Sequence, residues 1–177
     1  MANEQQQLAF IDKYQGLAQS AGNELSINFD IPLAQWALET GWGTADYMIT
    51  ANNLGGIMAG PNKLWGFKTL DQFLAVYVNS MRRDCPVLRD GQSHLSDTAT
   101  EIFSGSSYNP NPNYGAEVES VVQSIANLHQ TSSQTEQTES TKPTTLADLA
   151  EHYVGFWGPN WEQAQHLAAT LWDMGIR

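Results

Sequence analysis

The stretch Leu33-Ala-Gln-Trp-Ala-Leu-Glu-Thr-Gly-Trp-Gly43 combines an apolar helical pattern with one carboxylate, Glu39. Pro32 suits the first turn of a helix and Gly41 suits its end, so the pattern predicts a helix over 32–40. The negative end of the helix dipole and the apolar neighbours both disfavour a charged carboxylate at this position. The pKa of Glu39 should therefore be raised, and a general acid that works near neutral pH needs such a pKa.

The side chains of this stretch also have structural interpretations. On physical grounds alone, Glu39 is explained equally well as an exposed glutamate at a frayed helix end. Gln35 lies one turn earlier on the same helix face, which makes it a candidate substrate-binding residue. Trp36, inside the helix, is expected in the core.

The rest of the chain is expected to be mainly α-helical, because no convincing strand pattern occurs in it. Gly22 is expected to end the first helix, and residues 43–68 are expected to be irregular, with at most a short hairpin. The other expected elements are a helix over 4–21, a helix after the capping pair Thr69 and Gln72, a short helix between Thr98 and Gly105, a loop over 105–113, and a helix over 114–129 capped by Asn113.

A change in composition divides the chain into three parts. Residues 1–129 are expected to form the main domain. Residues 130–144 contain Gln, Thr, Ser, Glu, Lys and Pro and lack a hydrophobic core residue, which indicates a linker. Residues 145–177 have the pattern of a helical hairpin, whose role the sequence does not assign.

Charge and composition exclude several classes of protein. The chain has 177 residues, with 8 Lys and Arg against 19 Asp and Glu, so its net charge is −11. This acidity argues against nucleic acid as a partner. No apolar run approaches the roughly 18 residues of a membrane span. One cysteine cannot form an internal disulfide, and the N-terminus has no secretory pattern, so synthesis in the cytoplasm is expected.

Few residues other than Glu39 are candidates for chemistry. Ser93 lacks the glycine pattern of a nucleophile elbow, and Cys85 has no evident base beside it. We therefore expect neither a metal nor another cofactor. The histidines show no metal-ligand spacing, and they are His94, His129, His152 and His166.

Three motifs in order resemble those of the bacterial glucosaminidases of glycoside hydrolase family seventy-three, which occur in flagellar-rod hydrolases and autolysins. Ala37-Leu-Glu-Thr-Gly-Trp-Gly43 is similar to the family's Ala-Leu-Glu-Ser-Gly-Trp-Gly. Asn52-Asn-Leu-Gly-Gly-Ile-Met-Ala59 is similar to Asn-Asn-Leu-Phe-Gly-Ile-Lys-Ala. Tyr108-Asn-Pro-Asn-Pro-Asn-Tyr114 is similar to a family run that opens a helix.

The resemblance implies a lysozyme-like fold and an enzyme that cuts peptidoglycan at the β-1,4 bond after N-acetylglucosamine. Residues 1–129 would be the catalytic domain, with Glu39 as general acid and Tyr114 as an active-site tyrosine. Residues 52–59 would contact the sugar. Aromatic rings in loops can stack on sugar faces. The expected substrate-binding residues, these aromatics included, are Gln35, Trp42, Asn52, Asn53, Trp65 and Tyr108.

The sequence departs from the family at the catalytic base. Typical members carry a second glutamate on a β-hairpin lobe, but here residues 60–68 are short and contain no carboxylate. The β-lobe is therefore expected to be reduced. Asp46 and Asp71 are the nearest candidates for a base, and Asp71 better fits a structural role in a first helical turn. Assistance by the substrate's 2-acetamido group, or water held by Tyr114, would make a second carboxylate unnecessary.

Several alternatives stay open from the sequence. A lytic transglycosylase or muramidase on the same fold also fits one glutamate, and a non-catalytic glycan-binding protein fits the missing carboxylate. The substrate lies in the periplasm or cell wall, so the expected routes are a phage lysis system, a phage tail, or injection into a target cell. If it is injected, the protein resembles the compact glucosaminidase effectors of type VI secretion systems. That resemblance implies an immunity protein that inhibits it by blocking the cleft. Acidity spread over both parts, −7 in residues 1–129 and −4 beyond, leaves room for a basic partner.

Overall fold

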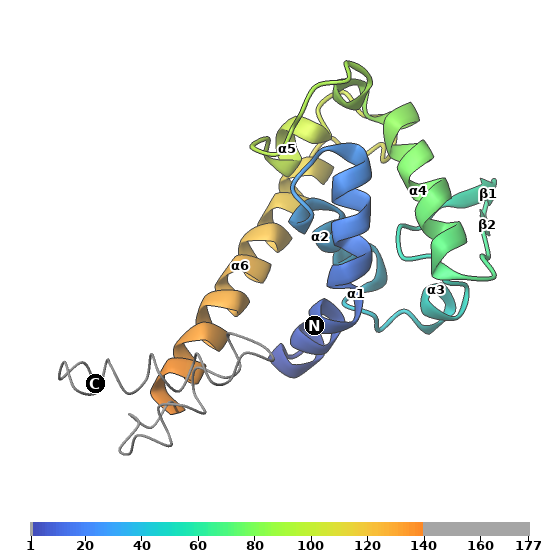
Figure 1. Cartoon of the computed structure of the whole chain (residues 1–177). Coiled ribbons are helices and arrows are strands. Elements are labelled where there is room, and N and C mark those ends of the chain that lie inside the picture. Colours follow the sequence, from blue (N-terminus) through green and yellow to red (C-terminus); the bar gives the residue numbers. More distant parts are fainter. Residues whose placement is uncertain (1, 140–177) are drawn as a thin grey trace, which may run out of the picture. The chain divides into compact units, whose positions relative to one another are not determined.

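The computed structural model describes residues 2–139, with side chains described as far as Gln130 (Figure 1). Residues up to Gln130 form one compact unit. Most of it is helical and its one sheet has two short strands, which confirms the mainly α fold with a reduced β-lobe. The elements are α1 (Glu4–Leu25), α2 (Asp30–Thr40), α3 (Asp46–Thr50), β1 (Met58–Gly60), β2 (Lys63–Leu64), α4 (Leu70–Asp84), the 3-10 helix η1 (Pro86–Arg89), α5 (Ala99–Ile102) and α6 (Tyr114–Glu139).

Helix α2 is the centre of this unit, because every residue from 31 to 37 is buried. Helix α1 packs against α2 (Figure 1). Helix α4 packs on Trp36 through aromatic edge contacts. The ring centroid of Trp36 lies 5.4 Å from that of Phe73 and 5.2 Å from that of Tyr77. The helix ends as predicted at Gly41, whose φ of 57° is left-handed. This ending fixes Glu39 in the last turn of a buried helix.

The prediction that Gly22 ends the first helix was wrong. Helix α1 continues to Leu25 and ends where Ser26 adopts a left-handed φ of 57°. Gly22 instead allows a close approach between two segments, because a Cβ atom on it would lie 2.9 Å from the Cα of Phe29. Its role is therefore to let α1 pack against the start of α2.

The two helix starts predicted from capping patterns, at Thr69 and Thr98, are both present. The hydroxyl of Thr98 and the carboxylate of Glu101 form a reciprocal capping box at α5. Thr69 accepts a hydrogen bond from the N–H of Gln72, whereas the Gln72 side chain accepts from the N–H of Lys68 instead of closing the box.

Helix α6 is longer than predicted. It runs to Glu139, whereas a helix over 114–129 and a linker from residue 130 were expected from the sequence. Residues 130–142 contain neither Gly nor Pro, so nothing in them breaks a helix before Pro143. The remainder of the expected linker and the hairpin expected over 145–177 lie outside the described residues. None of the helices described here is long and apolar enough to cross a membrane.

Two glycines of α1 provide a matched test of this packing. Gly22→Ala should lower the free energy of unfolding by about 1–3 kcal/mol, since the new methyl group meets backbone atoms of Phe29. Gly16→Ala should raise it by about 0.5–1 kcal/mol, because Gly16 is exposed in the same helix and has open space around it. Chemical denaturation of the two variants measures both. Equal effects of the two substitutions would contradict the packing role of Gly22.

Candidate active site

The carboxylate of Glu39 lies half-buried in the last turn of α2. The hydroxyl of Tyr114 donates a hydrogen bond to its Oε1 atom at 2.7 Å. Burial raises the pKa of Glu39, and the hydrogen bond from Tyr114 opposes that rise without cancelling it. The raised pKa expected from the sequence is thus present, with a proton donor held against one carboxylate oxygen.

Tyr114 is the first residue of α6 and is only 4% exposed. Its ring meets that of Phe103 edge-on at 5.1 Å and lies nearly parallel to that of Tyr108 at 6.2 Å. Burial raises the pKa of the Tyr114 hydroxyl, and the charge of Glu39 raises it further. The hydroxyl therefore keeps its proton and donates a hydrogen bond to Glu39.

A glycine pair lies next to the carboxylate, and its second member packs against the other oxygen. Gly56 has a φ of +64°, and a Cβ atom on it would lie 3.0 Å from Oε2 of Glu39. Gly55 is equally confined, because a Cβ atom there would lie 2.9 Å from the Tyr108 hydroxyl. Sequence reasoning did not single out these residues. The sequence feature that could have identified them is the pair Gly55-Gly56, at the place where the similar family motif has Phe-Gly.

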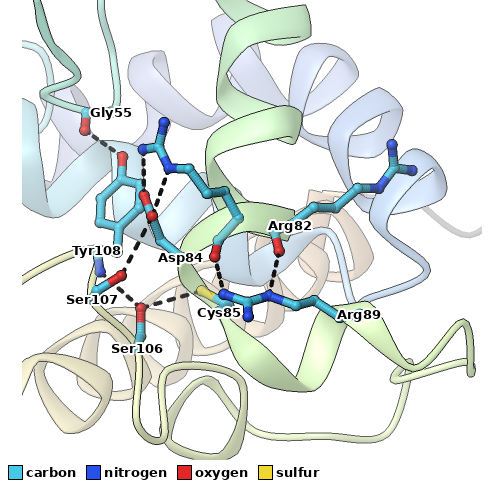
Figure 2. A network of polar contacts seen from close by, with 9 residues as sticks. Gly55, Arg82, Asp84, Cys85, Arg89, Ser106, Ser107 and Tyr108 are labelled. Carbon is cyan, nitrogen blue, oxygen red and sulfur yellow. Dashed lines mark hydrogen bonds and ion pairs between the residues drawn. The ribbon is translucent and has the colours of Figure 1, made fainter.

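Tyr108 connects the loop before α6 to this glycine pair. Its hydroxyl donates to the carbonyl of Gly55 at 2.5 Å, and its backbone N–H donates to the Ser106 hydroxyl at 3.0 Å (Figure 2). The same loop is fixed to the end of α4, since the Ser107 N–H donates to the carbonyl of Asp84 at 3.0 Å. We expected Tyr108 to bind substrate, but its hydroxyl supports the loop over Glu39.

The contacts of Cys85 and His94 indicate structural roles for both residues. Burial raises the pKa of the Cys85 thiol to about 11, and its Sγ atom lies 3.4 Å from the Ser106 hydroxyl (Figure 2). Such a thiol is a poor nucleophile, in line with the prediction. The ring of His94 contacts the carboxylates of Asp90 and Asp97. Within residues 2–130, no group of three or more metal-binding side chains lies together.

The two expected sugar-binding asparagines shape the loop and hairpin. Asn53 is fully buried, and its Nδ2 donates to the carbonyls of Ile57 and Trp65, both at 2.8 Å. Its Oδ1 accepts from the N–H of Ile57. The amide of Asn53 is thus enclosed by the hairpin, and its contact with substrate stays a prediction. Asn52 has a φ of 49°, and its Nδ2 donates to the carbonyl of Phe67 at 3.0 Å.

Gln35 is also fully buried, and its predicted role in substrate binding stays a prediction. Its Oε1 atom accepts a hydrogen bond from the Tyr77 hydroxyl at 2.6 Å. The two expected tryptophans differ in exposure. Trp65 is 44% exposed and stacks on Phe67 at 5.5 Å, so one face is available for a sugar ring. Trp42 is half-buried, and its ring packs edge-on against Phe10.

The candidate bases lie at helix starts. Asp46 is exposed in the first turn of α3, and Asp71 is exposed in the first turn of α4. A negative charge is favoured at both places by the helix dipole, which explains them without catalysis. The hairpin segment 58–68 contains no Asp or Glu.

A buried helix thus ends in a half-buried carboxylate, against which the loop leading into a short β-hairpin packs. Residues 15–127 match the glucosaminidase family model, described as mannosyl-glycoprotein endo-β-N-acetylglucosaminidase. The chain belongs to this family and is a glycosidase. A similar solved structure is a peptidoglycan hydrolase mutant from Sphingomonas sp. A1, with 21% identity and a TM-score of 0.56 over 69% of this chain and 96% of that chain. This likeness concerns the fold. No curated protein sequence matches the chain.

The glycine beside Glu39 gives a direct test of the site. Gly56→Ala should reduce glycosidase activity by about 100-fold, since the added methyl group displaces Oε2 and strains a left-handed backbone. Gly60→Ala is the matched control in the hairpin, because a Cβ atom there meets nothing within 4 Å. Initial rates of the two variants make the comparison, with melting temperatures to exclude unfolding. Full activity of Gly56→Ala would contradict the assigned site.

Proposed function

We propose that the protein hydrolyses the β-1,4 bond after N-acetylglucosamine in peptidoglycan, with Glu39 as general acid. The observation that supports this most is the half-buried Glu39 with a raised pKa and a hydrogen bond from Tyr114, in a chain of the glucosaminidase family. The similar structure is described as that of a peptidoglycan hydrolase. Trp65 offers an exposed ring for a neutral sugar.

The proposed reaction needs one carboxylate. Glu39 gives its proton to the glycosidic oxygen as the bond to the anomeric carbon breaks. The carbonyl oxygen of the substrate's 2-acetamido group attacks that carbon and forms a cyclic oxazolinium. Water then opens this ring and returns a proton to Glu39. The absence of Asp and Glu from residues 58–68 favours this route, with Asp46 or Asp71 as base in the alternative route.

Two other cleavages on the same fold are alternatives. A muramidase would leave N-acetylmuramic acid at the new reducing ends, and a lytic transglycosylase would leave 1,6-anhydro ends. Mass spectrometry of digested cell walls separates them from the proposed enzyme, which should leave reducing N-acetylglucosamine. A mannosylated glycoprotein is the control substrate, because the family description names that class.

Three carboxylate variants test the assignment of roles. Glu39→Gln should lower kcat/KM on peptidoglycan by about 10²–10⁴-fold, because an amide cannot give up the proton. Asp46→Asn and Asp71→Asn should each keep activity within a few-fold if the substrate's acetamido group assists. A loss in either control as large as in Glu39→Gln would identify that aspartate as the base. An active Glu39→Gln enzyme would overturn the proposed function.

We further propose that the enzyme is an antibacterial protein delivered to the cell wall of a target, with injection favoured over phage lysis. The net charge of −11 supports this, since a resident wall enzyme commonly holds anionic polymers through basic groups. A basic immunity protein that covers Glu39 would complement this charge.

Directed expression in a bacterium tests the place of action. Export of the protein to the periplasm should lyse the cells, whereas the same protein kept in the cytoplasm should not. Export of Glu39→Gln controls for toxicity unrelated to glycan cleavage. Equal lysis from both compartments would contradict a cell-wall target.

A further inference from the structure

Tyr108 lies between the two groups that touch the carboxylate of Glu39. Its ring lies nearly parallel to that of Tyr114, with the ring centroids 6.2 Å apart. Its hydroxyl donates a hydrogen bond to the carbonyl of Gly55 at 2.5 Å (Figure 2). The Tyr114 hydroxyl in turn donates to Oε1 of Glu39, and Gly56 packs against Oε2. One side chain thus contacts the support of each carboxylate oxygen.

The peptide bond between Gly55 and Gly56 transmits the position of the Tyr108 hydroxyl to the carboxylate. A peptide unit is planar, so the carbonyl oxygen of Gly55 and the N and Cα atoms of Gly56 move together. The unit is tightly packed at both ends. A Cβ atom on Gly55 would lie 2.9 Å from the Tyr108 hydroxyl, and one on Gly56 would lie 3.0 Å from Oε2 of Glu39. Movement at the hydroxyl end therefore changes the packing at Oε2.

The backbone of Tyr108 is fixed to the end of α4. Its N–H donates to the Ser106 hydroxyl at 3.0 Å, and the Ser107 N–H donates to the carbonyl of Asp84 at 3.0 Å. A carboxylate at a helix C-terminus is disfavoured by the helix dipole. Arg83 offsets this for Asp84 with two hydrogen bonds, of 2.7 and 2.6 Å, to its carboxylate oxygens (Figure 2). Tyr108 is therefore held in place independently of Glu39.

We propose that Tyr108 is a positioning residue for the general acid, which holds Tyr114 through its ring and the Gly55–Gly56 peptide through its hydroxyl. This inference rests on the proposed function. The hydroxyl proton of Tyr108 is donated to a backbone carbonyl, so Tyr108 acts on Glu39 through these two groups. The carboxylate is thereby oriented from two sides by one residue.

The two supports act on the pKa of Glu39 in opposite directions. Burial raises this pKa, and the packed Gly55–Gly56 turn contributes to the burial. The hydrogen bond from Tyr114 lowers it. Loss of the Tyr108 hydroxyl frees the turn and lets water reach Oε2, which should lower the pKa, whereas loss of the Tyr114 hydroxyl should raise it.

The other titratable groups at the site stay neutral in the working range. Within residues 2–130, the titratable side chains that interact electrostatically with Glu39 are Tyr77, Tyr108 and Tyr114. Burial raises the pKa of each hydroxyl above its ordinary value of 10.0. A change in the pH dependence of the reaction near neutral pH therefore reports Glu39 itself.

The pH profile of kcat/KM on peptidoglycan tests the proposal, because its basic limb reports the proton on Glu39 in the free enzyme. Tyr108→Phe keeps the ring and removes only the hydroxyl. It should move the limb to lower pH and lower kcat by about 10- to 100-fold, with KM within a few-fold, since the acid is displaced. Tyr114→Phe should move the limb to higher pH. Tyr47→Phe is the matched control, because Tyr47 is 69% exposed on α3, and it should change neither quantity.

Ser106→Ala is the second variant and decides the question if Tyr108→Phe does not fold. It removes the acceptor of the Tyr108 N–H and leaves both tyrosine side chains in place, so the limb should move in the same direction by less. An unmoved or raised limb in folded Tyr108→Phe, or a loss confined to KM, would overturn the positioning role while Glu39→Gln is still inactive. With Ser106→Ala as the deciding variant, an unmoved limb would overturn it. Activity in Glu39→Gln would instead overturn the proposed function, and this inference with it.

Discussion

A half-buried carboxylate at the end of an apolar helix is the constraint on which this candidate site depends. Helix α2 is enclosed by other helices, so its last turn cannot bring Glu39 fully into water. Burial raises the pKa of Glu39, and the hydroxyl of Tyr114 stabilises the charged form enough to keep the group in place. Burial and the Tyr114 hydrogen bond thus act on the pKa of Glu39 in opposite directions, and the effect of burial is the larger.

The surrounding loops serve this carboxylate. The glycine pair Gly55 and Gly56 lets backbone approach where any side chain would collide. Tyr108 holds that pair through the Gly55 carbonyl, and the loop that carries Tyr108 is itself fixed to the end of α4 (Figure 2). On the hairpin side, Asn53 fixes the same loop by donating hydrogen bonds to the carbonyls of Ile57 and Trp65. Residues distant in sequence thus fix the loop that packs against Glu39.

The sequence predicted what local physics decides. The C-terminal stop at Gly41, the caps at Thr69 and Thr98, and the raised pKa of Glu39 all follow from short-range patterns. Other roles depend on contacts across the fold. Gly22 meets Phe29 of the next helix, and Gln35 meets Tyr77, which is 42 positions away. No local pattern distinguishes a glutamine that binds sugar from one that accepts a hydrogen bond from a buried tyrosine.

The protonation of Glu39 is the property from which the rest of the account follows. An NMR titration of the side-chain carboxyl carbons, with the Glu39 signal assigned by its loss in Glu39→Gln, measures it without substrate. The expected result is a pKa above the ordinary glutamate value of 4.5, because burial disfavours the charged form. A pKa at or below that value would show that the site does not hold a proton for catalysis, and would contradict the role of Glu39 as the general acid.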